Sequence, residues 1–181
     1  MENKECTFLK ADYKRAFEQT SYQGELRKTL HVWTSPGFQA IAVYRINRWL
    51  MQNKIPFIGL ILQRWIEIMT GICIPPETKI GPGLFIHHFG GIVINSNAQI
   101  GENCDLHHGV TIGNKNSGGP SPAIGDRVTI GVGAVVLGGI TIGNDVEIGA
   151  NAVVVDDIPD HSIVVGIPGK VIKTKIPSVS K

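Results

Sequence analysis

The sequence predicts a mainly β protein, a parallel β-helix of hexapeptide repeats that follows a small helical region. The main observation is an aliphatic residue that recurs every six positions from Ile74 to Val154. A glycine often follows this residue, and a second small or apolar residue tends to lie four positions after it. A spacing of six fits neither the helical period nor strict strand alternation, whereas hexapeptide repeats are typical of a parallel β-helix. We therefore expect three hexads to close each triangular coil of about 18 residues, with the aliphatic side chains stacked inside.

Two interruptions divide the repeat. Ile92 and Val93 are two extra residues between the hexads of Ile86 and Ile94. The stretch 115–123 keeps the phase of the repeat but has no aliphatic residue to bury, so we expect a protruding loop there. Off-pattern loops on a rigid, repetitive scaffold are where function is expected.

Three segments follow from this pattern: a helical region over 1–72, the β-helix over 73–170 and a basic C-terminal tail over 171–181. Ser35 and Pro36 predict a helix start, because serine is a good N-cap and proline suits the first helical position. The tail is expected to be a mobile end. Core packing is expected for the three tryptophans of the helical region, Trp33, Trp49 and Trp65.

Composition and charge exclude several classes of protein. The net charge of +2 is too small to indicate nucleic-acid binding, and no aromatic-rich basic stripe interleaves the repeats. The cysteines, Cys6, Cys73 and Cys104, are odd in number and far apart, which is typical of reduced thiols in a cytoplasmic protein. Residues 1–10 lack the apolar core of a signal peptide. The apolar run 55–69 contains charged residues and is shorter than the roughly 20 residues of a membrane span.

Four of the six histidines form two adjacent pairs, His87-His88 and His107-His108. Twenty residues separate the pairs, which equals one coil plus the two-residue insertion, so the second pair should lie one coil directly above the first. Three interpretations remain open at this point. The histidines decorate one face of the solenoid, or they bind zinc as neutral imidazoles, or one of them is a general base near neutral pH.

Several motifs resemble the serine acetyltransferase branch of the hexapeptide-repeat acyltransferases. They are T-G-I-C-I-P-P over 70–76, I-G-P-G-L-F-I-H-H-F-G-G-I-V-I over 80–94, G-V-T-I-G over 109–113 and V-G-I-P-G-K over 165–170. The resemblance implies a left-handed β-helix and a homotrimer, or a pair of trimers, with active sites between subunits. It also implies an O-acetyltransferase that uses acetyl-CoA as co-substrate, without a metal, and a helical region that helps to define the acceptor pocket.

The resemblance places the catalytic general base at His88, within the His-x-x-Gly-Ile-Val context. That role is chemically reasonable, because a thioester is already activated and the acceptor hydroxyl needs only to lose its proton as attack begins. Backbone N–H groups near Gly113 and Asn114 are candidate donors to the developing oxyanion.

The resemblance also implies that CoA lies in the groove between two β-helices. Small residues there let the pantetheine arm approach the backbone, and a lysine meets the nucleotide phosphates as a point charge. Corner geometry of the solenoid explains any one of these residues equally well. The matching positions are Gly113, Asn114, Val132, Gly133, Ala150 and Lys170, with Lys173 and Lys175 beyond.

The chain departs from the family on the acceptor side. Cys73 stands where the family has the aspartate that orients the histidine, so Asp105, His87 or a backbone carbonyl is expected to take over. The loop lacks the family's Arg-His pair, and the family's acid that contacts the serine amine has no match, its aligned place being near Tyr22. We therefore expect an O-acetyltransferase whose acceptor is a sugar hydroxyl. The alternatives are a serine O-acetyltransferase of cysteine biosynthesis, a zinc-dependent β-helix carbonic anhydrase and a non-catalytic scaffold.

Overall fold

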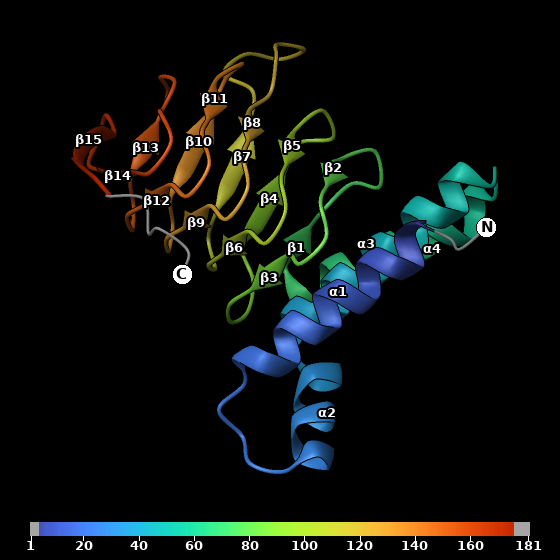
Figure 1. The fold of residues 1–181 in the computed structure, drawn as a ribbon. Coiled ribbons are helices and arrows are strands. Elements are labelled where there is room, and N and C mark those ends of the chain that lie inside the picture. The colour runs from blue at the N-terminus through green and yellow to red at the C-terminus, as the bar shows by residue number, and fades with distance from the viewer. Residues whose placement is uncertain (1–3, 176–181) are drawn as a thin grey trace.

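Four helices lie at one end of a triangular solenoid in the computed structural model, which describes residues 4–175 (Figure 1). The helices are α1 (Lys4–Gln19), α2 (Glu25–Thr34), α3 (Pro36–Gln52) and α4 (Pro56–Thr70). Ser35 caps α3 as expected, with its hydroxyl oxygen accepting from the Phe38 N–H at 3.4 Å. Gly71 ends α4 in the left-handed conformation, with φ of 64°. Within residues 4–175, no helix is long and apolar enough to cross a bilayer.

The strands that follow are short and form the three faces of a parallel β-helix. One face contains β1-β4-β7-β10-β13, the second β2-β5-β8-β11, and the third β3-β6-β9-β12-β14 with β15 antiparallel at its edge. The predicted architecture is therefore confirmed. The bounds are β1 (Ile72–Cys73), β2 (Lys79–Ile80), β3 (Phe85–Ile86), β4 (Ile92–Ile94), β5 (Gln99–Ile100), β6 (Asp105–Leu106), β7 (Thr111–Gly113), β8 (Ala123–Ile124), β9 (Thr129–Ile130), β10 (Val135–Leu137), β11 (Thr141–Ile142), β12 (Glu147–Ile148), β13 (Val153–Val154), β14 (Ser162–Val165) and β15 (Lys170–Thr174).

The repeated aliphatic side chains stack in register inside the solenoid. Ile86 pairs with Leu106 and Leu106 pairs with Ile130 on one face, and all three are buried. Residues 115–118 form an exposed loop between β7 and β8, as the break in the pattern predicts (Figure 1). The loop contains no strand, so β8 is the next strand after β7.

The two-residue insertion does not lie at Ile92 and Val93. These residues pair with Ile72 and Cys73 of β1 as regular strand residues, and Ile92 is buried like Val110 in the next coil. The surplus length lies instead in the corner between β3 and β4, residues 87–91. The strand keeps its register because each buried position is fixed by its neighbours above and below, whereas a corner can widen.

The segment expected as a mobile tail is partly ordered. Residues 171–174 belong to β15, which pairs antiparallel with β14, and Lys175 forms an ion pair with Glu147 at 2.8 Å. The parallel strands leave the edge of β14 unpaired, and β15 covers it. The rest of the predicted tail, residues 176–181, lies outside the described residues.

The tryptophans are not core residues, contrary to the prediction. Trp33, Trp49 and Trp65 are 52%, 38% and 53% exposed. Smaller groups fill the interior of the helical region, including Phe38, against which the Trp33 ring packs edge-on at 5.2 Å. Trp65 lies on the exposed side of α4, which also carries the apolar side chains of Phe57, Ile61 and Ile68.

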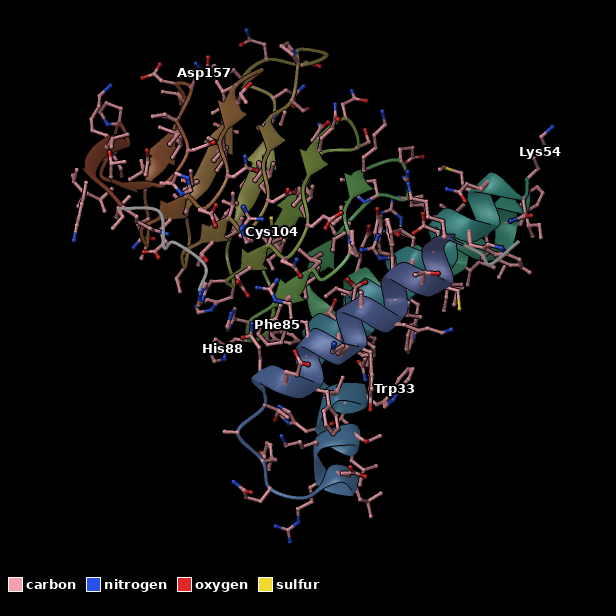
Figure 2. The ribbon with its side chains drawn as sticks, in the orientation of Figure 1. Trp33, Lys54, Phe85, His88, Cys104 and Asp157 are labelled. Atoms are coloured by element: carbon pink, nitrogen blue, oxygen red, sulfur yellow. The ribbon has the colours of Figure 1, made fainter. Side chains whose placement is uncertain are left out.

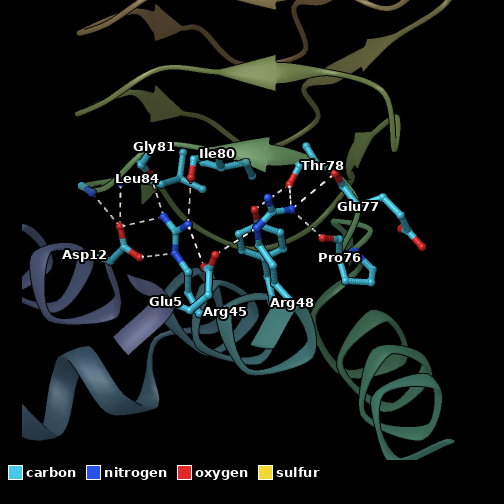
Figure 3. Close-up of polar contacts among 12 residues, drawn as sticks. Glu5, Asp12, Arg45, Arg48, Pro76, Glu77, Thr78, Ile80, Gly81 and Leu84 are labelled. Atoms are coloured by element: carbon cyan, nitrogen blue, oxygen red, sulfur yellow. Dashed lines mark hydrogen bonds and ion pairs between the residues drawn. The ribbon is translucent and has the colours of Figure 1, made fainter. Parts of the chain in front are cut away.

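A buried ionic cluster attaches the helices to the first coil (Figure 3). Arg45 on α3 pairs with Asp12 on α1 at 2.8 Å and donates to the carbonyl oxygens of Ile80 and Gly81 at 2.9 and 2.6 Å. Asp12 Oδ1 also accepts from the Gly83 and Leu84 N–H groups. Burial raises the pKa of Asp12, although Arg45 opposes the shift. The cluster fixes how the helical region sits on the solenoid.

Candidate active site

The two histidine pairs lie one coil apart, as predicted. β3 and β6 are adjacent parallel strands, so the residues after them occupy equivalent corners. The His87 and His107 rings stack with centroids 4.2 Å apart and 2° between their planes. His88 and His108 meet edge to face, at 5.8 Å and 76°. The widened first corner accounts for the difference, because it carries His88 out of register with His108.

His88 is exposed at the edge of the solenoid, beside the helical region (Figure 2). Its φ of 63° is in the left-handed region, which is uncommon for a residue with a side chain. Next to it is a pocket of about 350 Å³ formed by the end of α1, the last turn of α2, the start of α3 and the corner after β3. Gly37 permits this approach of α3, since an added Cβ would lie 2.5 Å from the Ile86 carbonyl oxygen.

Asp105 lies against Arg15 and His87. Its Oδ2 is 2.6 Å from the Arg15 guanidinium, and its Oδ1 is 3.5 Å from His87 Nε2. Burial lowers the pKa of His87, although Asp105 opposes that shift. Burial also lowers the pKa of His107, and the neighbouring His87 adds to the effect. The stacked pair therefore favours neutral imidazoles, and the carboxylate that was expected to orient His88 faces His87.

Cys73 lies on β1, and its thiol is hydrogen-bonded to Glu67 Oε1 at 3.2 Å. Burial and the neighbouring carboxylate raise the pKa of Cys73 to about 11, so the thiol stays protonated at neutral pH. Glu67 is the carboxylate that the sequence analysis missed here. Burial opposes its ionisation, but hydrogen bonds from Gln63 and Cys73 and the charge of Arg64 lower its pKa overall. No periodic pattern marks Glu67, because its position depends on how α4 meets β1.

Three of the six predicted CoA positions fall on one edge of the prism, the edge on which His88 lies. Val132 and Gly133 form the corner between β9 and β10, and Ala150 lies at the corner between β12 and β13. Hydrogen bonds link successive corners, from the Gly133 N–H to the His108 carbonyl and from the Asn151 N–H to the Val132 carbonyl. Hydrogen-bonded corners therefore run along this edge from the coil of His88 towards the C-terminal coil.

Two other predicted positions, Gly113 and Asn114, are not on that edge. Gly113 ends β7 and Asn114 begins the exposed loop, so both lie at the opposite end of β7 from that edge. The Asn114 amide is already used, since its Nδ2 donates to the Asn116 carbonyl at 2.8 Å. Lys170 begins β15 and is two-thirds exposed, with Asp156 3.3 Å away. Its neighbour Gly169 donates to the Val153 carbonyl at 2.7 Å, which places Lys170 beside β13.

The alternative of a zinc site lacks a cluster of ligands in the part of the chain that the structure describes. No group of three or more His, Cys, Asp or Glu side chains there is arranged to hold a metal ion. A zinc site needs three or four such ligands at short distance. His87 and His107 stack face to face, a geometry in which their nitrogens do not converge on one point.

Comparison with known proteins identifies the family. Residues 121–156 match the family model of the bacterial transferase hexapeptide with six repeats. The chain is 40% identical to serine acetyltransferase of Synechococcus elongatus over 166 residues, which are 91% of this chain and 67% of the relative. The chain belongs to the serine acetyltransferase family. It is a CoA-dependent O-acetyltransferase of the hexapeptide-repeat class.

Solved structures of the family share the fold. Serine acetyltransferase of Neisseria gonorrhoeae, in complex with serine, aligns with a TM-score of 0.83 at 36% identity, over 92% of this chain and 68% of that one. Serine acetyltransferase of Brucella abortus, in complex with coenzyme A, aligns with a TM-score of 0.85 at 27% identity, over 94% of this chain and 68% of that one. The solenoid is thus the expected left-handed β-helix, and the transferase spans about two thirds of the length of these proteins.

Proposed function

We propose that the transferase moves the acetyl group of acetyl-CoA to the hydroxyl of L-serine, with His88 as the general base. One observation carries the proposal: His88 lies where the pocket of the helical region meets the edge that leads to Lys170. An acceptor in the pocket and a thioester along the edge would therefore meet at this imidazole. Serine is favoured over the sugar acceptor expected from the missing residues, because the relatives at about 40% identity are serine acetyltransferases.

In this proposal His88 accepts the proton of the acceptor hydroxyl at a ring nitrogen and gives it to the CoA thiolate that leaves as the C–S bond breaks. Acetyl-CoA, when bound, supplies an activated acyl group, so the chain needs no covalent intermediate. The corner backbone contributes N–H groups that could face the developing oxyanion. Holding both substrates at one corner supplies the remaining advantage, which is alignment.

A homotrimer with shared active sites belongs to the same proposal. His88 and Phe89 are exposed in the single chain, Phe89 by 61%, and leave the corner open on its outer side. A neighbouring prism packed there would exclude water from the reaction. Light scattering should then report three times the 19.6 kDa chain mass.

A sugar hydroxyl is the second candidate, and the lining of the pocket favours it. The lining residues include three histidines, but no Asp, Glu, Lys or Arg side chain. An amino acid presents an ammonium and a carboxylate that such a pocket pairs less readily than neutral hydroxyls.

The test compares acceptors by the rate of thiol release from acetyl-CoA. L-serine should give a kcat/KM of about 10⁴ M⁻¹s⁻¹ or above, the usual range for enzymes on their own substrates. L-alanine, which lacks the hydroxyl, is the matched control for hydrolysis of the thioester. A free sugar that exceeds L-serine under the same conditions would replace serine by the second candidate.

A further inference from the structure

The family resemblance places an aspartate that orients the general base where this chain has Cys73. Asp105, one of the groups expected to replace that aspartate, faces His87. We propose that His108, one coil above, is a positioning residue that holds the ring of His88 in place by an edge-to-face contact. The proposal rests on the proposed function, because it requires His88 to act as the general base.

Few contacts orient His88 within the single chain. None of residues 4–175 forms a hydrogen bond with its exposed ring, so both ring nitrogens are open to an acceptor proton. The ring has two aromatic neighbours. The centroid of His87 is 6.3 Å away with 46° between the planes, and that of His108 is 5.8 Å away with 76°. Only the second contact has the edge-to-face arrangement that aromatic rings prefer.

His108 presents a fixed surface to this contact. Its Nδ1 is inaccessible to solvent and has no hydrogen-bond partner among the described residues, so the ring is packed into the corner after β6. The carbonyl oxygen of His108 accepts from the Gly133 N–H at 3.0 Å, which ties its main chain to the next coil. Side chains packed in this way keep one rotamer. A fixed ring can therefore restrict the exposed ring of His88 beside it.

The backbone of the widened corner explains why the two rings cross instead of stacking. His88, Gly90 and Gly91 have positive φ values of 63°, 80° and 72°, whereas Gly109 alone does so in the corner after β6. The left-handed conformation turns the His88 side chain out of the register of the coil above, so its ring meets His108 at a steep angle. Such strained backbone persists where its surroundings restrain it, and the contact with His108 is one such restraint.

Restraint of this kind affects the rate more than the binding of either substrate. A general base acts only when its nitrogen faces the hydroxyl proton as attack begins. A ring that rotates freely spends much of its time in other orientations, so fixing it supplies alignment. An aspartate would do this by accepting a hydrogen bond from the ring, whereas His108 does it by packing. Loss of the contact should therefore lower kcat and leave KM unchanged.

The test measures kcat with the preferred acceptor of the wild type, and KM for acetyl-CoA, in variants of His108. His108→Leu removes the flat ring but keeps apolar bulk, and it should lower kcat about tenfold, which corresponds to about 1.4 kcal/mol. His108→Asn, which keeps a polar atom near the place of Nδ1 but has no ring, should show the same loss. His108→Phe keeps a ring and should stay within about threefold of wild type. An equal loss in all three variants would overturn a role for the ring.

The KM for acetyl-CoA should stay within about twofold of wild type in each variant. His107→Leu is the matched control, because His107 lies in the same corner but stacks on His87. Its kcat should stay within about threefold of wild type, and a loss as large as that of His108→Leu would contradict a specific contact with His88.

A double variant shows whether His108 acts through His88. In the His88→Ala background, His108→Leu should lower kcat by less than about twofold, because no general base is left to position. A further tenfold loss in that background would overturn this inference, and so would an unchanged kcat for His108→Leu when His88→Ala alone is inactive. Full activity of His88→Ala would overturn the proposed function as well.

Discussion

The attachment of the helical region to the solenoid should depend on one buried arginine. Arg45 is 1% exposed, and its guanidinium reaches Asp12 and the Ile80 and Gly81 carbonyls. Arg45→Met leaves Asp12 buried with two backbone donors but no opposite charge. Removing one partner of a buried ion pair costs about 3–5 kcal/mol. At about 2–4 °C per kcal/mol for a chain of this size, Tm should fall by about 6–20 °C.

Urea denaturation followed by circular dichroism, at one protein concentration for all variants, measures the loss in free energy of unfolding. The matched control is Lys14→Met on the same helix α1. Lys14 and Glu18 form an exposed pair at 3.9 Å, so its loss should change the free energy of unfolding by less than about 0.5 kcal/mol. A loss below about 1 kcal/mol for Arg45→Met would refute the view that this cluster anchors the helices.

Three further predictions concern the stacked histidines, the thiol and the terminal lysine. The folded-state pKa values of His87 and His107 lie below the ordinary 6.5, so the unfolded chain binds more protons and stability should fall as pH drops below about 6.5. The midpoint of denaturation should move accordingly between about pH 7.5 and 5.5, and a flat profile would contradict the assignment. Cys73→Asp places a second carboxylate against Glu67, so it should destabilise the protein by about 1 kcal/mol or more; if adding Glu67→Gln fails to relieve this, the repulsion is not the cause. Lys170→Gln should raise KM for acetyl-CoA several-fold at low salt and leave KM for serine unchanged, and an unaltered KM for acetyl-CoA would remove Lys170 from the CoA site.

The solenoid and the stacking of the histidine pairs could be predicted because each depends on a spacing along the chain. A period of six fixes which residues face inward, and twenty residues equal one coil plus two. The predicted location of the two-residue insertion, at Ile92 and Val93, was wrong, since the sequence alone does not tell whether a strand or a corner absorbs it. Ile92 pairs with Ile72, and the surplus therefore widened the corner that contains His88.

The acceptor side of the site could not be predicted in the same way. Asp105 pairs with Arg15 of α1, and Glu67 of α4 meets Cys73, and both contacts are set by how the helices dock on the first coil. That docking depends on single buried pairs such as that between Arg45 and Asp12, which leave no periodic trace.

In the proposed mechanism the imidazole of His88 removes the acceptor proton. The most direct measurement is the rate of thiol release at saturating acetyl-CoA and L-serine for His88→Ala, with the distant His161→Ala as control. Loss of a general base should reduce kcat by about 10²–10⁴-fold while CoA affinity and assembly stay as in the wild type. A kcat within a few-fold of wild type for His88→Ala would contradict the account.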